Sequence, residues 1–306
     1  MNDTARVIIN LGAPSRADTE CARKFLYEFL SDRRVIMLPQ PLRAALAYHI
    51  ARKRKHKYAE SLKKIFQDGM HPLRKHTEAL AKKLTEQGGK PVFAAYRYGE
   101  NNIPDTIAKL KRAGYKRFVF LPLYPQQTRS TTNSAVRRIE KTLKHKEYKI
   151  AKPYFDDPNY ISALASTIPS KCQTLLVTFH SVPISHTWGT PYVSQCKRTA
   201  ELLGRNLGIK DVAVAYQSRM SFGKWLGPSA KEVVQQLAKS GRKSICVIAP
   251  SFACDCSETT VELGEELKTI FTDAGGEKFF LCHCLNDTDV HARLLLKIFK
   301  NLEMKL

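Results

Sequence analysis

Short runs of β-branched and aromatic residues alternate with longer helical patterns along almost the whole chain, and this alternation constrains the fold most. Such a repeat is typical of βαβ units, which build a parallel sheet with helices on both faces. The sequence predicts four strands in its first half, at 6–10, 92–97, 117–121 and 149–154, and four in its second half, at 174–179, 212–216, 244–249 and 278–282.

Because each half carries four strands, the predicted fold class is α/β with two lobes. The lobes are expected to cover residues 1–155 and 156–306 and to meet near Tyr154–Pro158. A length of 306 residues, 43% of them hydrophobic, is sufficient for two such cores. Ligand and active sites in α/β folds lie at the carboxyl ends of the strands, so functional residues are expected in the loops that follow the strands.

The chain is strongly basic, with 50 Lys and Arg against 28 Asp and Glu, a net charge of +22. This surplus fits nucleic-acid binding, attraction to an anionic membrane surface, or general lysine enrichment. The densest run, at 52–57, lies in a predicted helix at 42–66. The absence of an RNA-binding signature, zinc-finger spacing or recognition-helix pattern favours a solvated or membrane-facing helix, and no nucleic-acid partner is expected.

Several classes of protein are excluded. Neither G-x-G-x-x-G nor G-x-x-x-x-G-K-[ST] occurs, so nucleotide cofactors lose support, and no apolar run approaches the length of a membrane span. The first residues enter an apolar strand pattern at once, which predicts no secretory signal peptide. We therefore expect a cytoplasmic protein with reduced thiols, with any membrane contact peripheral at the inner face.

Polar clusters follow several of the predicted strands. A hydroxyl-rich loop at 124–134 suits either helix capping or ligand contact, and His180 ends the fifth strand. After the seventh strand, Glu258, Glu262 and Glu266 recur at i, i+4 and i+8, which places them along one face of a helix. The alternatives for this row are a solvated face, a cation path or a proton relay.

An imidazole and several carboxylates suit a divalent metal held loosely, and the same groups accept protons. A site that handles a divalent ion and removes protons fits metal insertion into a ligand with N–H groups. Metal-assisted hydrolysis fits as well.

Seven strings occur in the order found in ferrochelatases, and the chain resembles that family from about residue 6 to its end. They are Ile9–Pro14, Tyr96–Gly99, Leu123–Gln126 with Ser130–Thr132, Phe179–Pro183, Gly189–Cys196, Tyr216–Arg219 with Trp225–Pro228, and Asp255–Thr259. The resemblance implies two Rossmann-like lobes with a cleft between them, the chelatase fold. It implies a lyase of haem biosynthesis that inserts Fe²⁺, as substrate, into protoporphyrin IX with release of two protons.

The resemblance also implies roles for individual residues. His180 and Glu258 match the catalytic pair that faces the metal, and Glu262 and Glu266 match an acidic row described as an iron or proton path. The expected metal contacts are thus His180, Glu258, Glu262 and Glu266. The basic segment at about 41–67 matches a lip of the cleft. Expected porphyrin contacts are Leu11, Arg54, Arg97, Tyr98, Tyr124, Trp225 and Phe252.

The chain departs from the family pattern where hydroxyl or acidic groups are usual. These positions carry Leu62, His71, Thr190 and Ala230-Lys231. Propionate docking is therefore expected to use Arg54, its neighbouring lysines and His71, and the choice between protoporphyrin and coproporphyrin stays open. A cobalt chelatase of the same fold and a non-catalytic porphyrin-binding protein are the alternative functions.

Two C-x-C pairs near the end, Cys254/Cys256 and Cys282/Cys284, are the only candidates for a resident metal centre. Four converging thiolates suit zinc or an Fe–S cluster. Family members with a [2Fe–2S] cluster place its cysteines differently and use a C-terminal extension that we do not expect here. Reduced thiols without a required cofactor are the preferred interpretation, and the oligomeric state is left open.

Overall fold

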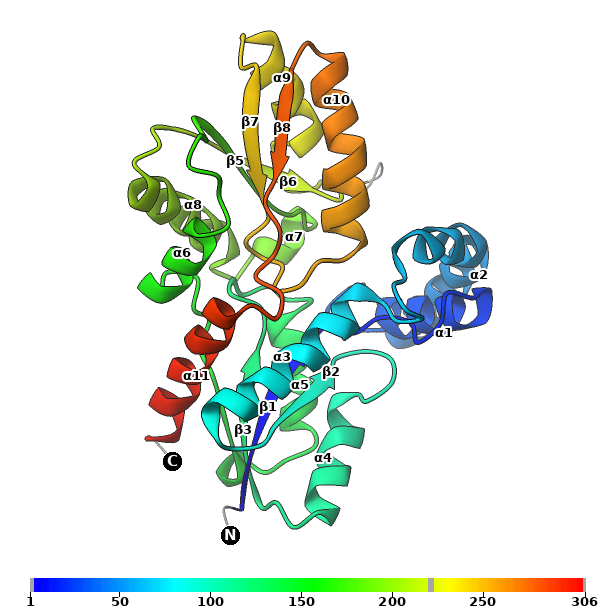
Figure 1. Cartoon of the computed structure of the whole chain (residues 1–306). Helices are drawn as coiled ribbons and strands as arrows, with labels where there is room; N and C mark the ends of the chain where they lie inside the picture. The colour runs from blue at the N-terminus through cyan, green and yellow to red at the C-terminus, as the bar shows by residue number, and fades with distance from the viewer. Residues whose placement is uncertain (1–2, 220–222, 305–306) are drawn as a thin grey trace. The chain divides into compact units, whose positions relative to one another are not determined.

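The computed structural model describes residues 3–219 and 223–304, which form two compact α/β units (Figure 1). Unit 1 consists of residues 1–123, 129–152 and 287–306, and unit 2 of residues 124–128 and 153–286. Each unit has one four-stranded parallel sheet with helices beside it, so the predicted two-lobe α/β architecture is confirmed.

The sheet of unit 1 has the order β2-β1-β3-β4. Its strands are β1 (Thr4–Asn10), β2 (Val92–Tyr96), β3 (Arg117–Pro122) and β4 (Tyr148–Ile150). Its helices are α1 (Thr19–Leu30), α2 (Gln40–Ile65), α3 (Pro72–Gly88), α4 (Ile103–Arg112), α5 (Thr132–Glu140), the 3₁₀ turn η1 (His145–Glu147) and α11 (Asp289–Glu303). The central strands β1 and β3 are almost fully buried, as expected for parallel strands covered on both faces.

The sheet of unit 2 has the order β6-β5-β7-β8. Its strands are β5 (Thr174–His180), β6 (Asp211–Gln217), β7 (Ser244–Ile248) and β8 (Lys278–Leu281). Its helices are α6 (Pro158–Ala165), α7 (Ile184–Thr187), α8 (Tyr192–Leu207), α9 (Ala230–Lys239), the π-helix η2 (Glu258–Leu267) and α10 (Lys268–Asp273). The two sheets have the same topology: in each unit the second strand along the chain lies at one edge of the sheet, next to the first strand.

All eight predicted strands are present, and the predicted helix at 42–66 corresponds to α2. The largest difference is at the fourth strand, where pairing ends at Ile150 although the sequence predicted 149–154. Pro153 lacks the N–H that a continued ladder would need, and the chain passes into unit 2 there.

The predicted division of the chain was wrong at its end. We expected residues 156–306 to form one lobe, but 287–306 belong to unit 1. Helix α11 packs against α3 and β3 (Figure 1). The carboxylate of Glu303 accepts from Nε and Nη2 of Arg6 on β1 at 2.6 and 2.8 Å. The apolar face of α11 is thus buried on the first unit, where Phe299 is fully enclosed.

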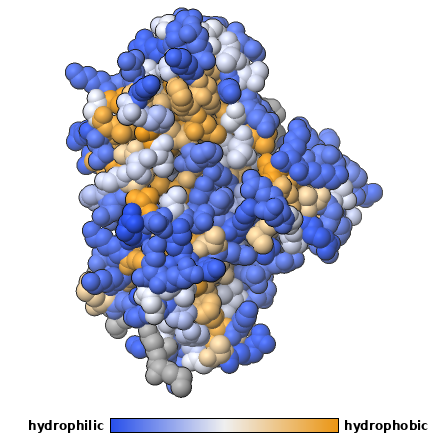
Figure 2. Space-filling model, viewed as in Figure 1, coloured by the Kyte–Doolittle hydropathy of each residue, from blue (hydrophilic) through white to orange (hydrophobic). Residues whose placement is uncertain are grey.

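The surface of the molecule is largely hydrophilic in the view of Figure 2, including most of the area over α1 and α2. Apolar colour gathers over β7 and β8 of unit 2, where Phe280 is 40% exposed. In the described part of the chain, no helix has both the length and the apolar character of a membrane span.

Candidate active site

His180 is the last residue of β5, where a parallel sheet presents side chains to a site. Its Nδ1 lies 2.6 Å from the carbonyl oxygen of Ser181, and its own carbonyl oxygen accepts from the Tyr192 hydroxyl at 2.8 Å. Since a carbonyl oxygen only accepts, Nδ1 must carry the proton of this hydrogen bond. In the neutral ring the lone pair is then on Nε2, which can take a proton or bind a metal.

Glu258 begins η2 and is partly exposed. Its Oε2 accepts from the Ser257 hydroxyl at 2.8 Å, and its backbone oxygen accepts from Nε2 of Gln217 at 3.3 Å. Burial alone would raise the pKa of Glu258, but its coulombic interaction with His180 and hydrogen bonds from Ser257 and Cys256 outweigh that effect and hold the pKa below its usual range. Glu258 is therefore an anion at neutral pH and interacts electrostatically with His180.

The acidic row lies on a π-helix, whereas the sequence predicted an ordinary helical face. Short π-helical segments are rare and occur frequently at functional sites, because the wider turn shifts side chains relative to an α-helix. Glu262 accepts from the backbone N and the hydroxyl of Ser218 at 2.6 and 2.5 Å. Glu266 is exposed and pairs with Nζ of Lys231 at 3.0 Å.

A small pocket of about 90 Å³ lies beside this row in unit 2. Its lining includes Ser218, Arg219, Lys231 and Glu262. Charged and hydroxyl groups make most of the polar lining, so the pocket suits a hydrated ion or water and is far too small for a tetrapyrrole.

Apolar side chains surround the end of β5. The rings of Phe252 and His180 have centroids 6.4 Å apart. The backbone of Trp225 forms an isolated antiparallel β-bridge with Pro183, which lies three residues after His180. Both Phe252 and Trp225 are partly exposed, as contact with a flat ligand requires. Trp188, which follows the short helix α7, is 68% exposed.

The other residues that are expected to contact the porphyrin differ in their exposure and in their hydrogen-bond partners. Leu11 is partly exposed and Arg54 is exposed on α2, so both can meet a ligand. Arg97 bonds Ser134 Oγ at 2.6 Å and pairs with Asp32. Tyr124 follows β3 but belongs to unit 2, and its side chain is 6% exposed and therefore offers little surface to a ligand.

Tyr98 is corrected by the structure. Its side chain is 1% exposed, its ring packs edge-on against Phe29 at 5.3 Å, and its hydroxyl donates to Asp32 Oδ2 at 2.9 Å. Burial raises the pKa of the Tyr98 hydroxyl. The residue belongs to the core of unit 1, where it holds Asp32 and Arg97 in place.

His71 is also corrected. It is 4% exposed and precedes α3, where its Nδ1 accepts from the backbone N of Leu73 at 3.1 Å. This is a helix cap, so the ring is committed to α3 and offers little surface to a ligand. Leu62 is buried within α2.

The four cysteines of the C-x-C pairs are all buried, and the structure shows them as free thiols. Burial raises the pKa of Cys256 and Cys284 well above its usual value and that of Cys282 to about 12, which favours the protonated form. In the described residues, no group of three or more His, Cys, Asp or Glu side chains has the geometry of a metal site.

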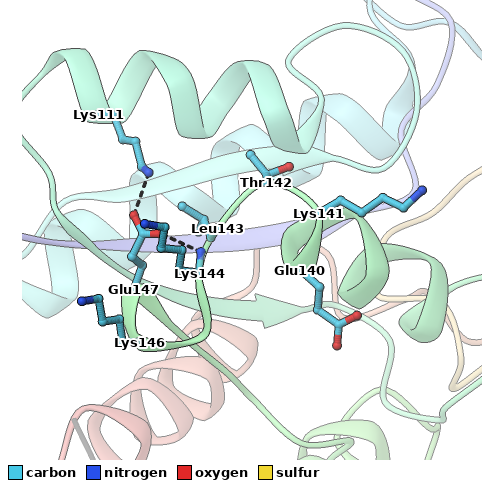
Figure 3. Close-up of a pocket in the computed structure, with 8 residues that line it drawn as sticks. All are labelled: Lys111, Glu140, Lys141, Thr142, Leu143, Lys144, Lys146 and Glu147. Atoms are coloured by element: carbon cyan, nitrogen blue, oxygen red, sulfur yellow. Dashed lines mark hydrogen bonds and ion pairs between the residues drawn. The ribbon is translucent and has the colours of Figure 1, made fainter.

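A larger hollow of about 630 Å³ lies in unit 1 around the loop between α5 and β4 (Figure 3). It is lined by Lys111, Glu140, Lys141, Thr142, Leu143, Lys144, Lys146 and Glu147. Glu147 is bonded to Lys111 Nζ at 2.7 Å and to the backbone of Lys144, and Leu143 is the one apolar side chain in the lining. This charged surface does not suit a flat aromatic ligand.

Known proteins resemble the chain in sequence over nearly its whole length. The family described as ferrochelatase matches residues 3–302. A ferrochelatase of Pseudomonas fluorescens is 34% identical over 330 residues, covering 96% of this chain and 97% of that protein. Ferrochelatase 1 of Shewanella oneidensis is 36% identical, covering 94% of this chain and 92% of that protein.

Solved structures resemble the chain in fold. SirB of Bacillus subtilis with Fe³⁺ has a TM-score of 0.60 at 12% identity, covering 99% of this chain and 96% of SirB. CbiX, described as the terminal enzyme for siroheme biosynthesis in denitrifying bacteria, has a TM-score of 0.53 at 13% identity, covering 98% of this chain and 99% of CbiX. These likenesses show the chelatase fold. The family match and the two relatives in sequence show that the chain belongs to the ferrochelatase family.

Proposed function

We propose that this protein is a lyase of haem biosynthesis that inserts Fe²⁺ into protoporphyrin IX and forms protohaem. The reaction exchanges one Fe²⁺ for the two N–H protons of the macrocycle, so it needs a proton acceptor and a negative charge near the metal. The observation that carries the proposal is the pair His180 and Glu258, in a chain that belongs to the ferrochelatase family.

The two side chains divide the work by their chemistry. Nε2 of His180 takes a pyrrole proton, because Nδ1 is already committed to Ser181. The Glu258 carboxylate is ionised, so it attracts the incoming dication and stabilises the imidazolium that forms on His180. Glu262 and Glu266 extend the negative charge along η2 and are proposed to deliver the ion to Glu258 or to carry the released protons away from it.

The remaining residues are proposed to hold the porphyrin. Phe252 and Trp225 contact the macrocycle face, Leu11 adds an apolar contact, and Arg54 meets a propionate, for which its planar fork is suited. Arg97 and Tyr124 are retained as predicted contacts.

Anaerobic Fe²⁺ insertion into protoporphyrin IX and coproporphyrin III, followed side by side by absorbance, tests activity and substrate choice together. We expect protohaem to form, and no insertion into either porphyrin would contradict the proposal. A shift of the Soret band on porphyrin binding without metal insertion would indicate the non-catalytic porphyrin-binding protein. Insertion of Co²⁺ but not of Fe²⁺ would indicate the cobalt chelatase. The comparisons favour neither, since the relatives are described as ferrochelatases.

A peripheral membrane contact is proposed for α2. Leu42, Leu46 and Tyr48 are 61%, 39% and 51% exposed on its first half, and the basic run 52–57 follows on the same helix. Apolar groups beside lysine and arginine are typical of helices that lie on anionic lipid. Cosedimentation with anionic vesicles, lost at high salt and absent with zwitterionic vesicles, is expected; equal recovery without lipid would contradict it.

A further inference from the structure

Asp255 and Asn286 form a closed hydrogen-bonded pair in unit 2. The backbone N of Asp255 donates to Asn286 Oδ1 at 2.8 Å, and Asn286 Nδ2 donates to Asp255 Oδ2 at 2.8 Å. The pair joins the segment before η2 to the loop after β8, 31 residues later in the chain. Neither residue has a part in the proton and metal chemistry proposed above.

Asn286 is held in an unusual backbone conformation. Its φ is +48°, in the left-handed region that residues other than glycine rarely adopt and that Asn tolerates best. Its backbone N also donates to the Ala253 oxygen at 2.9 Å. A residue other than glycine keeps this backbone conformation only where the surrounding structure holds it there, because a relaxed loop would avoid it.

Several hydrogen-bond donors surround the carboxylate of Asp255. Besides Asn286 Nδ2, its oxygens lie 3.1 Å from Thr259 Oγ1, 3.3 Å from the backbone N of Cys284 and 3.3 Å from His283 Nδ1. A carboxylate has about four acceptor positions, and the amide of Asn286, the hydroxyl of Thr259 and the backbone N of Cys284 donate to three of them. Asp255 is 8% exposed, so these bonds make it a fixed anchor.

The anchor bears on Glu258 through the backbone. Asp255 and Glu258 are three residues apart, and the turn between them is closed by the bond from Cys256 N to Thr259 Oγ1 at 2.9 Å. The Glu258 carboxylate bonds the neighbouring Ser257, which belongs to the same segment and moves with it. Its place relative to His180 therefore depends on how the segment is fastened.

We infer that Asn286 is a positioning residue for the reaction: through its reciprocal bonds with Asp255 it fixes the segment that carries Glu258. The inference rests on the proposed function, since it concerns the geometry of that same site. Loosening the pair should displace the carboxylate from the metal and leave the porphyrin contacts of Phe252 and Trp225 in place. The cost should therefore fall on kcat and not on the KM for porphyrin.

The test exchanges the two side chains. Asn286→Asp sets two carboxylates against each other. Asp255→Asn leaves one side-chain oxygen, which cannot accept from both Asn286 Nδ2 and the backbone N of Cys284, so each single variant disrupts the arrangement. The double variant D255N/N286D restores one donor and one acceptor with reversed polarity. We expect Asn286→Ala and both single variants to lose about 10- to 100-fold in kcat, the usual cost of losing a residue that orients a metal ligand. The double variant should recover most of that loss.

Asn101→Ala is the matched control, because Asn101 has the same left-handed backbone, with φ +54°, but lies in unit 1. It should keep wild-type kcat. Wild-type activity for Asn286→Ala, or a double variant that stays folded but is as slow as the single variants, would overturn the inference. A double variant that does not fold would also overturn it. Failure of the wild-type protein to make protohaem would instead refute the proposed function.

Discussion

The imidazole Nδ1 of His180 lies 2.6 Å from the carbonyl oxygen of Ser181, so the backbone of the next residue selects which ring nitrogen of His180 is reactive. The selection needs no second side chain and is set as soon as β5 ends.

This relationship gives a graded prediction for substitutions of His180. Asn places an amide near Nδ1 and keeps the bond to Ser181, whereas Gln reaches toward the position of Nε2. Because neither amide accepts a proton, we expect both variants to lose about 10²- to 10⁴-fold in kcat, with His180→Asn the more stable of the two in thermal unfolding. His145→Ala, an exposed histidine of unit 1, should behave as wild type. Near-normal turnover by His180→Asn would contradict the assignment.

Glu258→Gln should abolish insertion in the same assay without loss of fold. It removes the negative charge that balances His180 and keeps the side-chain volume. Glu265→Gln, an exposed position of the same π-helix, provides the control for any effect of charge on η2 itself. Equal loss in both variants would mean that the helix, and not the one carboxylate, is responsible.

Ser218 should separate backbone strain from function. It has φ +61° and binds Glu262 through both its N–H and its hydroxyl. Ser218→Ala removes the hydroxyl and keeps the strain, while Ser218→Gly removes both, so the glycine variant should be more stable than the alanine variant by about 1 kcal/mol. Urea unfolding measures the difference. If Glu262 takes part in metal delivery, both variants should show a higher KM for Fe²⁺.

The buried ion pair of unit 1 predicts a pH dependence of stability. Burial raises the pKa of Asp32, but hydrogen bonds from Ser134, the Arg34 backbone and Tyr98, with the charge of Arg97, leave it below the usual value. A depressed folded-state pKa stabilises the protein above the unfolded-state pKa of about 3.9 and ceases to do so as the pH falls through the folded-state value. Asp32→Asn should cost about 3 kcal/mol at pH 7. The gap between variant and wild type should close in acid, and a gap that widened below pH 4 would contradict the assignment.

Lys231 should weaken the attraction of η2 for cations. Its ammonium neutralises Glu266, and both side chains are about half exposed. Lys231→Ala should change the free energy of unfolding by less than about 1 kcal/mol, as is usual for exposed pairs. At low salt it should lower the KM for Fe²⁺ about twofold, and the effect should vanish in 1 M salt. An unchanged KM at low salt would exclude the outer end of the row from metal entry.

The thiols should react in an order set by exposure and pKa. A hydrogen bond with Cys246 lowers the pKa of Cys172, which is partly exposed, whereas burial raises those of Cys256 and Cys284. Cys172 should therefore be labelled by a disulfide reagent in the folded protein, and Cys256 and Cys284 only after unfolding. Iron and acid-labile sulfide, measured on the same anaerobic sample, report on the cluster alternative. Stoichiometric amounts of both would support it.

The strands were predictable because buried parallel strands impose a local pattern that needs no knowledge of the rest of the chain. The π-helical form of η2 was not, since Glu258, Glu262 and Glu266 share a face in either kind of helix. Tyr98 was misjudged because its motif position says nothing of burial, which Asp32 and Phe29 decide from α1 and its end. The contacts of Asn286 and Ser218 depend on left-handed backbone angles, which a serine does not signal and which an asparagine tolerates but does not require.

The attachment of α11 to unit 1 has a consequence for how the chain is made. Unit 2 is nearly continuous in sequence and can finish folding during synthesis, once β8 has emerged from the ribosome. Unit 1 begins first, yet it lacks the helix that covers β3 and the Glu303 partner of Arg6 until residues 287–303 have been made. The part translated first is therefore completed last, and a nonsense mutation that removes residues 287–303 would damage the N-terminal unit.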